Sequence, residues 1–142
     1  MDQGTHCLSF ERTIALQPAE CHKAFLQVVW VGGGGLGAPQ ILEPGNPETG
    51  QGCIRQVAGG IVEEILEAEI GKCLEYHVKS GPFPVSYHRG RVEFREAPDG
   101  CTSCLWTISF TPFIFFSLLV SGVIRVSLNM MLNTLVKRSG EF

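Results

Sequence analysis

Glu64 is the side chain of this sequence whose chemistry is most informative, because it is a carboxylate within an apolar alternation. Val62, Leu66 and Ala68 occupy the alternate positions around it. Alternate residues of a strand point to the same face of a sheet, so we expect Glu64 to lie on an apolar face. A carboxylate in such surroundings needs a partner or a proton. It could orient a bound ligand or act as the general base of an enzyme.

The segment at residues 72–79 has the two-residue period of a strand with one dry and one wet face. Leu74, Tyr76 and Val78 alternate there with charged residues and a histidine. The apolar set is expected to pack inward while the polar set faces water. An apolar face is therefore available on this strand for a binding site.

Other polar residues of the strand-like segments have a structural interpretation. Arg55 is placed to form an ion pair across a hairpin with Glu63 or Glu67. Further groups are expected on solvated strand faces, namely the arginines Arg89, Arg91 and Arg95 and the histidines His77 and His88.

Two motifs have the spacing of ligand sites but lack the context that such sites need. Cys101 and Cys104 are three residues apart, which places them on opposite faces of a strand and not around one metal ion. The glycine-rich segment 32–37 follows an apolar run, as in a dinucleotide-binding fingerprint. The helix that should receive the phosphates is prevented by Pro39, Pro44 and Pro47. We expect a flexible loop there, and neither a metal nor a cofactor.

The last third of the chain is almost free of charge, since Arg125 is the only charged residue between Asp99 and Lys137. Residues 105–124 are long and apolar enough for a membrane span. Apolar and hydroxyl residues alternate up to Pro112, however, which is typical of a strand. Polar residues then recur every four positions, at Ser117, Ser121, Arg125, Asn129, Asn133 and Lys137. We therefore expect a strand and a long amphipathic helix with a solvent-facing polar stripe, and no stable membrane span.

The remaining segments predict one α+β domain over residues 1–142. Strands are expected at residues 6–16, 40–43, 52–58, 61–68, 72–79, 86–96 and 102–111. A helical segment beginning at Pro18 follows the first strand, and the long helix spans about 113–138. This order predicts a curved seven-stranded antiparallel sheet wrapped around the C-terminal helix, with one or two short helices after the first strand.

Short fragments in this order resemble the START and pollen-allergen-like helix-grip superfamily, in its polyketide cyclase/dehydrase and lipid-transport branch (SRPBCC). The fragments are Pro18-Ala-Glu, Gly52-Cys-Ile-Arg, Glu63-Glu-Ile-Leu, Leu74-Glu-Tyr, Asp99-Gly with Thr102 leading to Trp106, and Pro112. The resemblance covers nearly the whole chain. It implies an internal cavity between the sheet and the long helix that holds apolar molecules.

The resemblance also implies which residues line that cavity. In the similar plant hormone receptors an acid and a tyrosine match Glu64 and Tyr87. Their Ile-Arg wording matches Ile124-Arg125 and places three residues of the long helix toward the cavity, with two methionines adding an adaptable wall. The candidate ligand-binding residues are Glu64, Tyr76, Val78, Tyr87, Arg89, Trp106, Leu119, Val123, Ser127, Met130 and Met131. Trp106 either lines the cavity or covers the outer sheet in a homodimer, and alternation does not choose between the two.

The sequence departs from the hormone receptors in ways that bear on function. Residues 40–43 contain no match for the lysine that pairs with a ligand carboxylate, and the gate and latch wording is missing at 59–60 and 82–84. We therefore expect a carrier or binding protein for an apolar small molecule. The alternative is a cyclase or dehydratase with Glu64 as general base and Tyr76, Tyr87 or Arg89 stabilising an enolate.

The remaining expectations concern partners and location. A net charge of -3 excludes a nucleic-acid binder. No apolar stretch of a signal peptide is visible, which favours a cytoplasmic protein with reduced cysteines. A third hypothesis is a membrane-associated protein that uses the cluster at residues 113–116 as an anchor.

Overall fold

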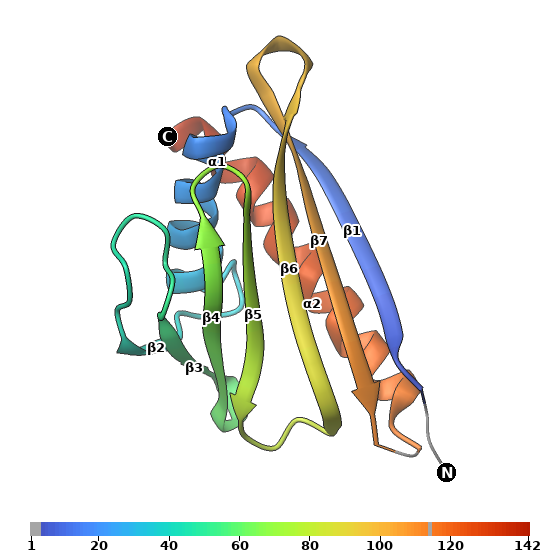
Figure 1. The fold of residues 1–142 in the computed structure, drawn as a ribbon. Helices are drawn as coiled ribbons and strands as arrows, with labels where there is room; N and C mark the ends of the chain where they lie inside the picture. Colours follow the sequence, from blue (N-terminus) through green and yellow to red (C-terminus); the bar gives the residue numbers. More distant parts are fainter. Residues whose placement is uncertain (1–3, 114) are drawn as a thin grey trace.

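A curved antiparallel sheet wraps around one long helix in the computed structural model of the chain (Figure 1), which describes residues 4–113 and 115–142. Within this described part the sheet has seven strands, in the order β1-β7-β6-β5-β4-β3-β2. Their bounds are β1 His6–Ile14, β2 Gln40–Glu43, β3 Ile54–Val57, β4 Ile61–Glu69, β5 Cys73–Ser80, β6 Val85–Ala97 and β7 Cys101–Pro112. The predicted α+β helix-grip architecture is confirmed, and each strand is found within a few residues of its expected position.

The helices follow the sheet in the expected places. Helix α1 (Pro18–Ala24) has its proline in the first turn, where the missing backbone N–H costs nothing, and it continues into the π-helical segment η1 (Phe25–Val31). Helix α2 (Ser117–Arg138) is the long C-terminal helix. The short helical turns are η2 Ala58–Gly60, η3 Pro98–Gly100 and η4 Ser139–Glu141.

Strand β7 shows why the charge-free tail is not one continuous helix. Its even-numbered residues are buried and its odd-numbered residues are partly exposed, as the alternation predicts. Trp106, Ile108 and Phe110 therefore belong to the core on the concave side of the sheet. The apolar tail is split between a sheet strand and helix α2.

Helix α2 is less amphipathic than the sequence predicts. Its buried face packs into the sheet, but the polar stripe is not simply solvated, because Arg12 of β1 donates hydrogen bonds to Asn129 and Asn133. Its exposed surface is largely apolar, with Leu118 89% and Val126 64% exposed.

By length and composition, the helical segment Ser117–Glu141 could cross a membrane, and 33% of its most apolar stretch is buried in the protein. Of the proposed anchor cluster, Phe113, Phe115 and Phe116 are exposed, and Ile114 lies outside the described residues.

The glycine-rich segment forms a loop, as expected, and β2 rather than a helix follows it. The loop presses against α2, since a Cβ on Gly34 would lie 2.4 Å from Cγ of Met131. Gly34 also has a φ of +59°, in the left-handed region that favours glycine. The glycine thus allows the loop to close one end of the space between sheet and helix.

Candidate functional site

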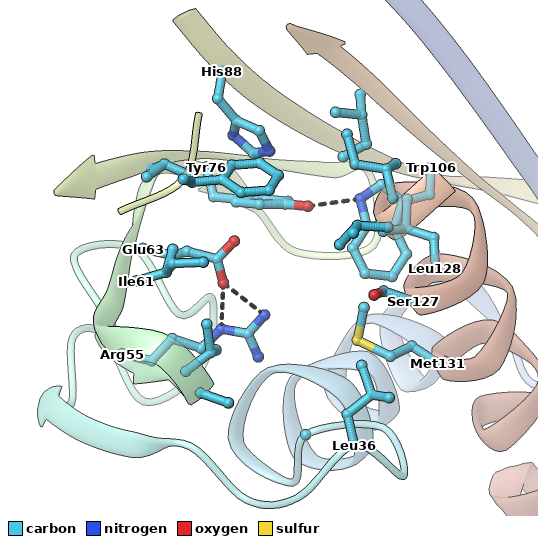
Figure 2. A pocket seen from close by; sticks show the side chains of 18 of the residues that line it. Leu36, Arg55, Ile61, Glu63, Tyr76, His88, Trp106, Ser127, Leu128 and Met131 are labelled. Atoms are coloured by element: carbon cyan, nitrogen blue, oxygen red, sulfur yellow. Dashed lines mark hydrogen bonds and ion pairs between the residues drawn. The ribbon is translucent and has the colours of Figure 1, made fainter. Parts of the chain in front are cut away.

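A cavity of about 410 Å³ lies between the concave face of the sheet and α2 (Figure 2). The sheet supplies residues from β3 to β7, and α2 and the glycine loop supply the opposite wall. Most of the lining is apolar, including Val57, Ile61, Val78, Ile108, Leu128 and Met131. The volume and composition are typical of a small-molecule site.

Six of the predicted ligand-binding residues line this cavity, namely Tyr76, Val78, Trp106, Val123, Ser127 and Met131. Trp106 is only 1% exposed and lies on the concave side, so it lines the cavity and does not cover an outer interface. The structure thus brings together residues from β5, β7 and α2, as the sequence analysis expected. Their role in binding stays a prediction.

Glu64 is placed wrongly by the sequence analysis, because it lies on the outer face of the sheet. Its carboxylate accepts a hydrogen bond at 3.1 Å from Nε2 of His77, and Nζ of Lys79 lies 3.9 Å from it. Both partners belong to the wet face of β5. The Glu64 carboxylate is therefore an outer-face ion-pair partner.

A bulge in β4 explains the error. Ile65 pairs with Tyr76 and Ala68 pairs with Leu74, but the register shifts between Ile65 and Glu67. The extra residue reverses the alternation, so that Ala68 and Ile65 both face inward although they are three positions apart. If regular alternation is assumed along β4, counting back from Ala68 in steps of two gives Glu64 as an inward residue. Because of the bulge, Glu63 is the residue that lines the cavity.

Tyr87 and Arg89 of β6 are also outside the cavity. Tyr87 is 45% exposed, and Nη1 of Arg89 lies 3.5 Å from the carboxylate of Glu75 on the outer face. The residue between them, His88, points inward and lines the cavity. The expected solvated arginine face is thus found, whereas the expectation that His88 is an exposed strand histidine is wrong.

Leu119 and Met130 of α2 do not line the cavity either. Leu119 is 58% exposed and lies one turn before Val123, the first cavity residue of the helix. Met130 is 42% exposed, whereas its neighbour Met131 is buried against the glycine loop. Adjacent helix residues differ by about 100° in direction, so one methionine serves as cavity wall and the other does not.

Arg55 and Glu63 form a buried ion pair at one side of the cavity. They are directly opposed in the β3–β4 ladder, and Nε and Nη2 of Arg55 each lie 2.9 Å from the same oxygen, Oε1 of Glu63. The side chains are 5% and 12% exposed. The guanidinium also stacks on Trp30 at 4.1 Å and donates from Nη1 to the carbonyl oxygens of Val29 and Trp30. The predicted pairing of Arg55 with Glu63 is confirmed, but it occurs inside the cavity.

Tyr76 and Trp106 form a polar contact on the opposite part of the cavity wall. Nε1 of Trp106 donates a 3.0 Å hydrogen bond to the Tyr76 hydroxyl. Burial raises the pKa of Tyr76, and the negative charge of Glu63 raises it further. The tyrosine is therefore a neutral phenol, whose own proton has no acceptor among the described residues.

His88 also contributes a polar group to the cavity wall. Its Nδ1 is buried without a hydrogen-bond partner among the described residues, and its ring lies 5.7 Å from that of Tyr76. Burial is the main cause that lowers the pKa of His88, so the ring is neutral near neutral pH. An uncharged imidazole can donate or accept one hydrogen bond with a bound molecule.

The site is suited to holding a molecule that has an apolar body and a polar end. Glu63, Tyr76 and Ser127 face a common space in Figure 2, with His88 beside Tyr76. The described residues contain no group of His, Cys, Asp or Glu suited to a metal ion. The polar side chains that face this space can form hydrogen bonds within a largely apolar enclosure.

Sequence reasoning missed Arg55, Glu63, His88 and the glycine loop as parts of the cavity. A signal did exist for Arg55 and Glu63, because their cross-strand pairing was expected. The face of the sheet on which this pair lies depends on the bulge in β4. No glycine or proline in the sequence marks that bulge.

Comparisons with known proteins give a fold but no close relative. No protein-family model matches the sequence, and no curated protein matches it either. Among solved structures, Ara h 8.0201 is 15% identical with a TM-score of 0.74, covering 98% of this chain and 100% of that one. Norcoclaurine synthase from Thalictrum flavum, solved with dopamine and hydroxybenzaldehyde, is 13% identical with a TM-score of 0.73, covering 97% and 88%. A Thermobifida fusca protein is 23% identical with a TM-score of 0.66, covering 95% and 93%.

Proposed function

We propose that this chain, which has the helix-grip fold of the START and pollen-allergen-like proteins, binds a hydrophobic small molecule between its sheet and α2. The observation that carries the proposal is the cavity of about 410 Å³, whose wall is mostly apolar and also includes the polar side chains of Glu63, Tyr76 and Ser127. A pocket of this kind holds a molecule mainly by apolar contacts, and its few polar groups fix the orientation of that molecule.

The enclosure supports a binding role for lipid-like, polyketide-like or hormone-like molecules. Apolar contacts from Val78, Ile108 and Leu128 would supply most of the affinity, and Glu63, Tyr76 and Ser127 would orient the polar end. The norcoclaurine synthase of the same fold was solved with two small aromatic molecules. A cytoplasmic location and a homodimer stay predictions.

An enzyme that uses Glu64 as general base is not supported by the position of that residue. The Glu64 carboxylate is on the outer face of the sheet, so it is separated from a molecule in the cavity. Glu63 is inside, but Arg55 holds one of its oxygens in an ion pair. Binding therefore accounts for more of the site than proton transfer does.

A fluorescent probe without charge tests the proposal. N-phenylnaphthylamine should bind the purified protein with increased emission, and Ser127→Trp should abolish this increase because the indole fills the cavity. The matched control is Val126→Trp, since the adjacent residue is on the exposed surface of α2. It should bind the probe as the unmodified protein does.

The outcomes separate cavity binding from surface adsorption. Equal loss of emission in both tryptophan variants, or none in Ser127→Trp when circular dichroism shows that it is folded, would contradict the proposal. Independently of the probe, native mass spectrometry of the purified protein would identify any apolar molecule that it retains.

A further inference from the structure

We infer that Glu63 makes this cavity selective for apolar molecules with an uncharged hydrogen-bond donor, such as an alcohol or phenol, and makes it reject carboxylates. This inference rests on the proposed binding function and specifies the ligand class. It is carried by the way in which Arg55 and Glu63 divide their hydrogen-bonding atoms between the protein and the cavity.

The donors of Arg55 are almost all used within the protein. Nη1 donates at 3.0 Å to the carbonyl of Val29 and at 2.7 Å to that of Trp30, while Nε and Nη2 both serve Oε1 of Glu63. Cζ of the guanidinium also lies 4.1 Å from the centre of the Trp30 ring, over its face. A ligand carboxylate would have to displace one of these contacts to gain the bidentate geometry that makes arginine an effective anion site.

The second carboxylate oxygen of Glu63, Oε2, is available to a molecule in the cavity. Both contacts with Arg55 end on Oε1, and Oε2 has no partner among the described residues. Figure 2 shows this second oxygen directed away from Arg55, on the side of Tyr76. An ionised carboxylate oxygen can only accept hydrogen bonds, so it favours a ligand that donates one.

Tyr76 and Ser127 complete the requirement of a hydroxyl ligand. The Tyr76 oxygen accepts from Trp106, and its proton remains free among the described residues. The Ser127 hydroxyl faces the same space. A ligand hydroxyl could therefore donate to Glu63 and accept from Tyr76 or Ser127, which uses both of its hydrogen-bonding functions.

The charge of Glu63 acts on two neighbouring side chains of the cavity, Tyr76 and His88. At Tyr76, Glu63 raises the pKa more than Arg55 lowers it, and at His88 the charge of Glu63 also raises the pKa. Burial outweighs this at His88 and keeps the imidazole neutral, so it supplies no compensating cation. A ligand carboxylate would lose its hydration and meet a like charge in an apolar enclosure, where such repulsion is poorly screened.

Competition against bound N-phenylnaphthylamine at neutral pH tests the selectivity. The competitors are decanol, methyl decanoate and decanoate, which share a chain and differ in the polar end. Decanol should displace the probe at the lowest concentration, the ester next, and decanoate at a concentration at least about tenfold higher than decanol.

Paired variants identify the source of the selectivity. Glu63→Gln should bring decanoate to within about threefold of decanol, because the amide is uncharged and can donate to a carboxylate. Glu64→Gln, the adjacent change on the outer face, should keep the ratio of the unmodified protein. If Glu63→Gln does not fold, Arg55→Met with Glu63→Leu removes both charges and should also reduce the ratio.

Several results would overturn the inference while leaving the proposed function intact. Decanoate could displace the probe as well as decanol does from the unmodified protein, or the ratio could persist in the folded Glu63 variants. By contrast, a failure of the probe to bind, or of every competitor to displace it, would count against cavity binding itself and would overturn both proposals.

Discussion

Glu63 and Glu64 are consecutive residues of one strand, yet one carboxylate lies in the cavity and the other on the partly solvated outer face of the sheet. Glu64 joins the ion pairs of the outer face, with His77 and Lys79, and its side chain is 25% exposed. Glu63 pairs with Arg55 inside the cavity, where the two side chains are nearly buried. The same residue type thus occupies a screened surface network on one side and an apolar enclosure on the other.

The difference shows where charge can carry function in this fold. Exposed ion pairs contribute about 0–1 kcal/mol, because water screens them and their side chains lose freedom. A buried pair costs much hydration, and removal of one partner leaves an uncompensated charge. The outer network can therefore change with little consequence, whereas the inner pair constrains both stability and the choice of ligand.

The largest expected effect is that of Arg55→Met. It leaves the Glu63 charge without its partner and takes two donors from the η1 carbonyls. We expect a loss of about 3–5 kcal/mol in the free energy of unfolding, measured by urea denaturation. The double variant Arg55→Met with Glu63→Leu should recover most of this loss. A single variant as stable as the unmodified protein would show that the pair is not effectively buried.

Tyr76→Phe should have the next largest effect. The variant removes the oxygen that accepts from Nε1 of Trp106 and leaves this buried donor without a partner. The expected loss is about 1–3 kcal/mol, again by urea denaturation, together with weaker binding of decanol. A smaller loss in stability than that of Glu64→Gln would reverse the proposed ranking of the two faces.

His88 should contribute to the acid sensitivity of the protein. Burial lowers the pKa of His88 below its ordinary value of 6.5, so its contribution to stability is present at higher pH. It is lost progressively as the pH falls from the unfolded-state pKa through the lower folded-state pKa, because in this window the unfolded chain binds the proton and the folded chain does not. His22, whose pKa is also lowered by burial, acts in the same direction.

His88→Phe should reduce this acid sensitivity without abolishing it. The measurement is the free energy of unfolding at several pH values from slightly alkaline to acidic, for the variant and the unmodified protein. Parallel curves over the whole range would show that His88 has the same proton affinity in the folded and unfolded chain.

The smallest expected effect is that of Glu64→Gln. Its contacts with His77 and Lys79 are partly exposed, so the free energy of unfolding should change by less than about 1 kcal/mol. Titration with N-phenylnaphthylamine should give unchanged binding. A loss comparable to that of Tyr76→Phe would mean that the outer network is as important as the inner polar groups.

The sequence by itself determined the order and type of the elements. Alternation in 102–111, the four-residue period of the C-terminal segment and the turn residues between strands are local signals, and local sterics and hydrophobic patterning produce them. Alternation also placed Tyr76 and Val78 on the face that lines the cavity. Ser127 was placed there by the family resemblance, and alternation left the face of Trp106 open. These residues lie in stretches where the regular period is not interrupted.

Only the tertiary structure decided which of two adjacent carboxylates faces the cavity. The bulge between Ile65 and Glu67 arises from the pairing of β4 with β5. Its one extra residue moves the preceding side chains of β4 to the opposite face from the one that regular alternation predicts. The glycine loop became a cavity wall for a similar reason, since its contact with Met131 joins segments far apart in the chain. Periodicity fixes faces within a segment, whereas pairing and packing between segments fix the site.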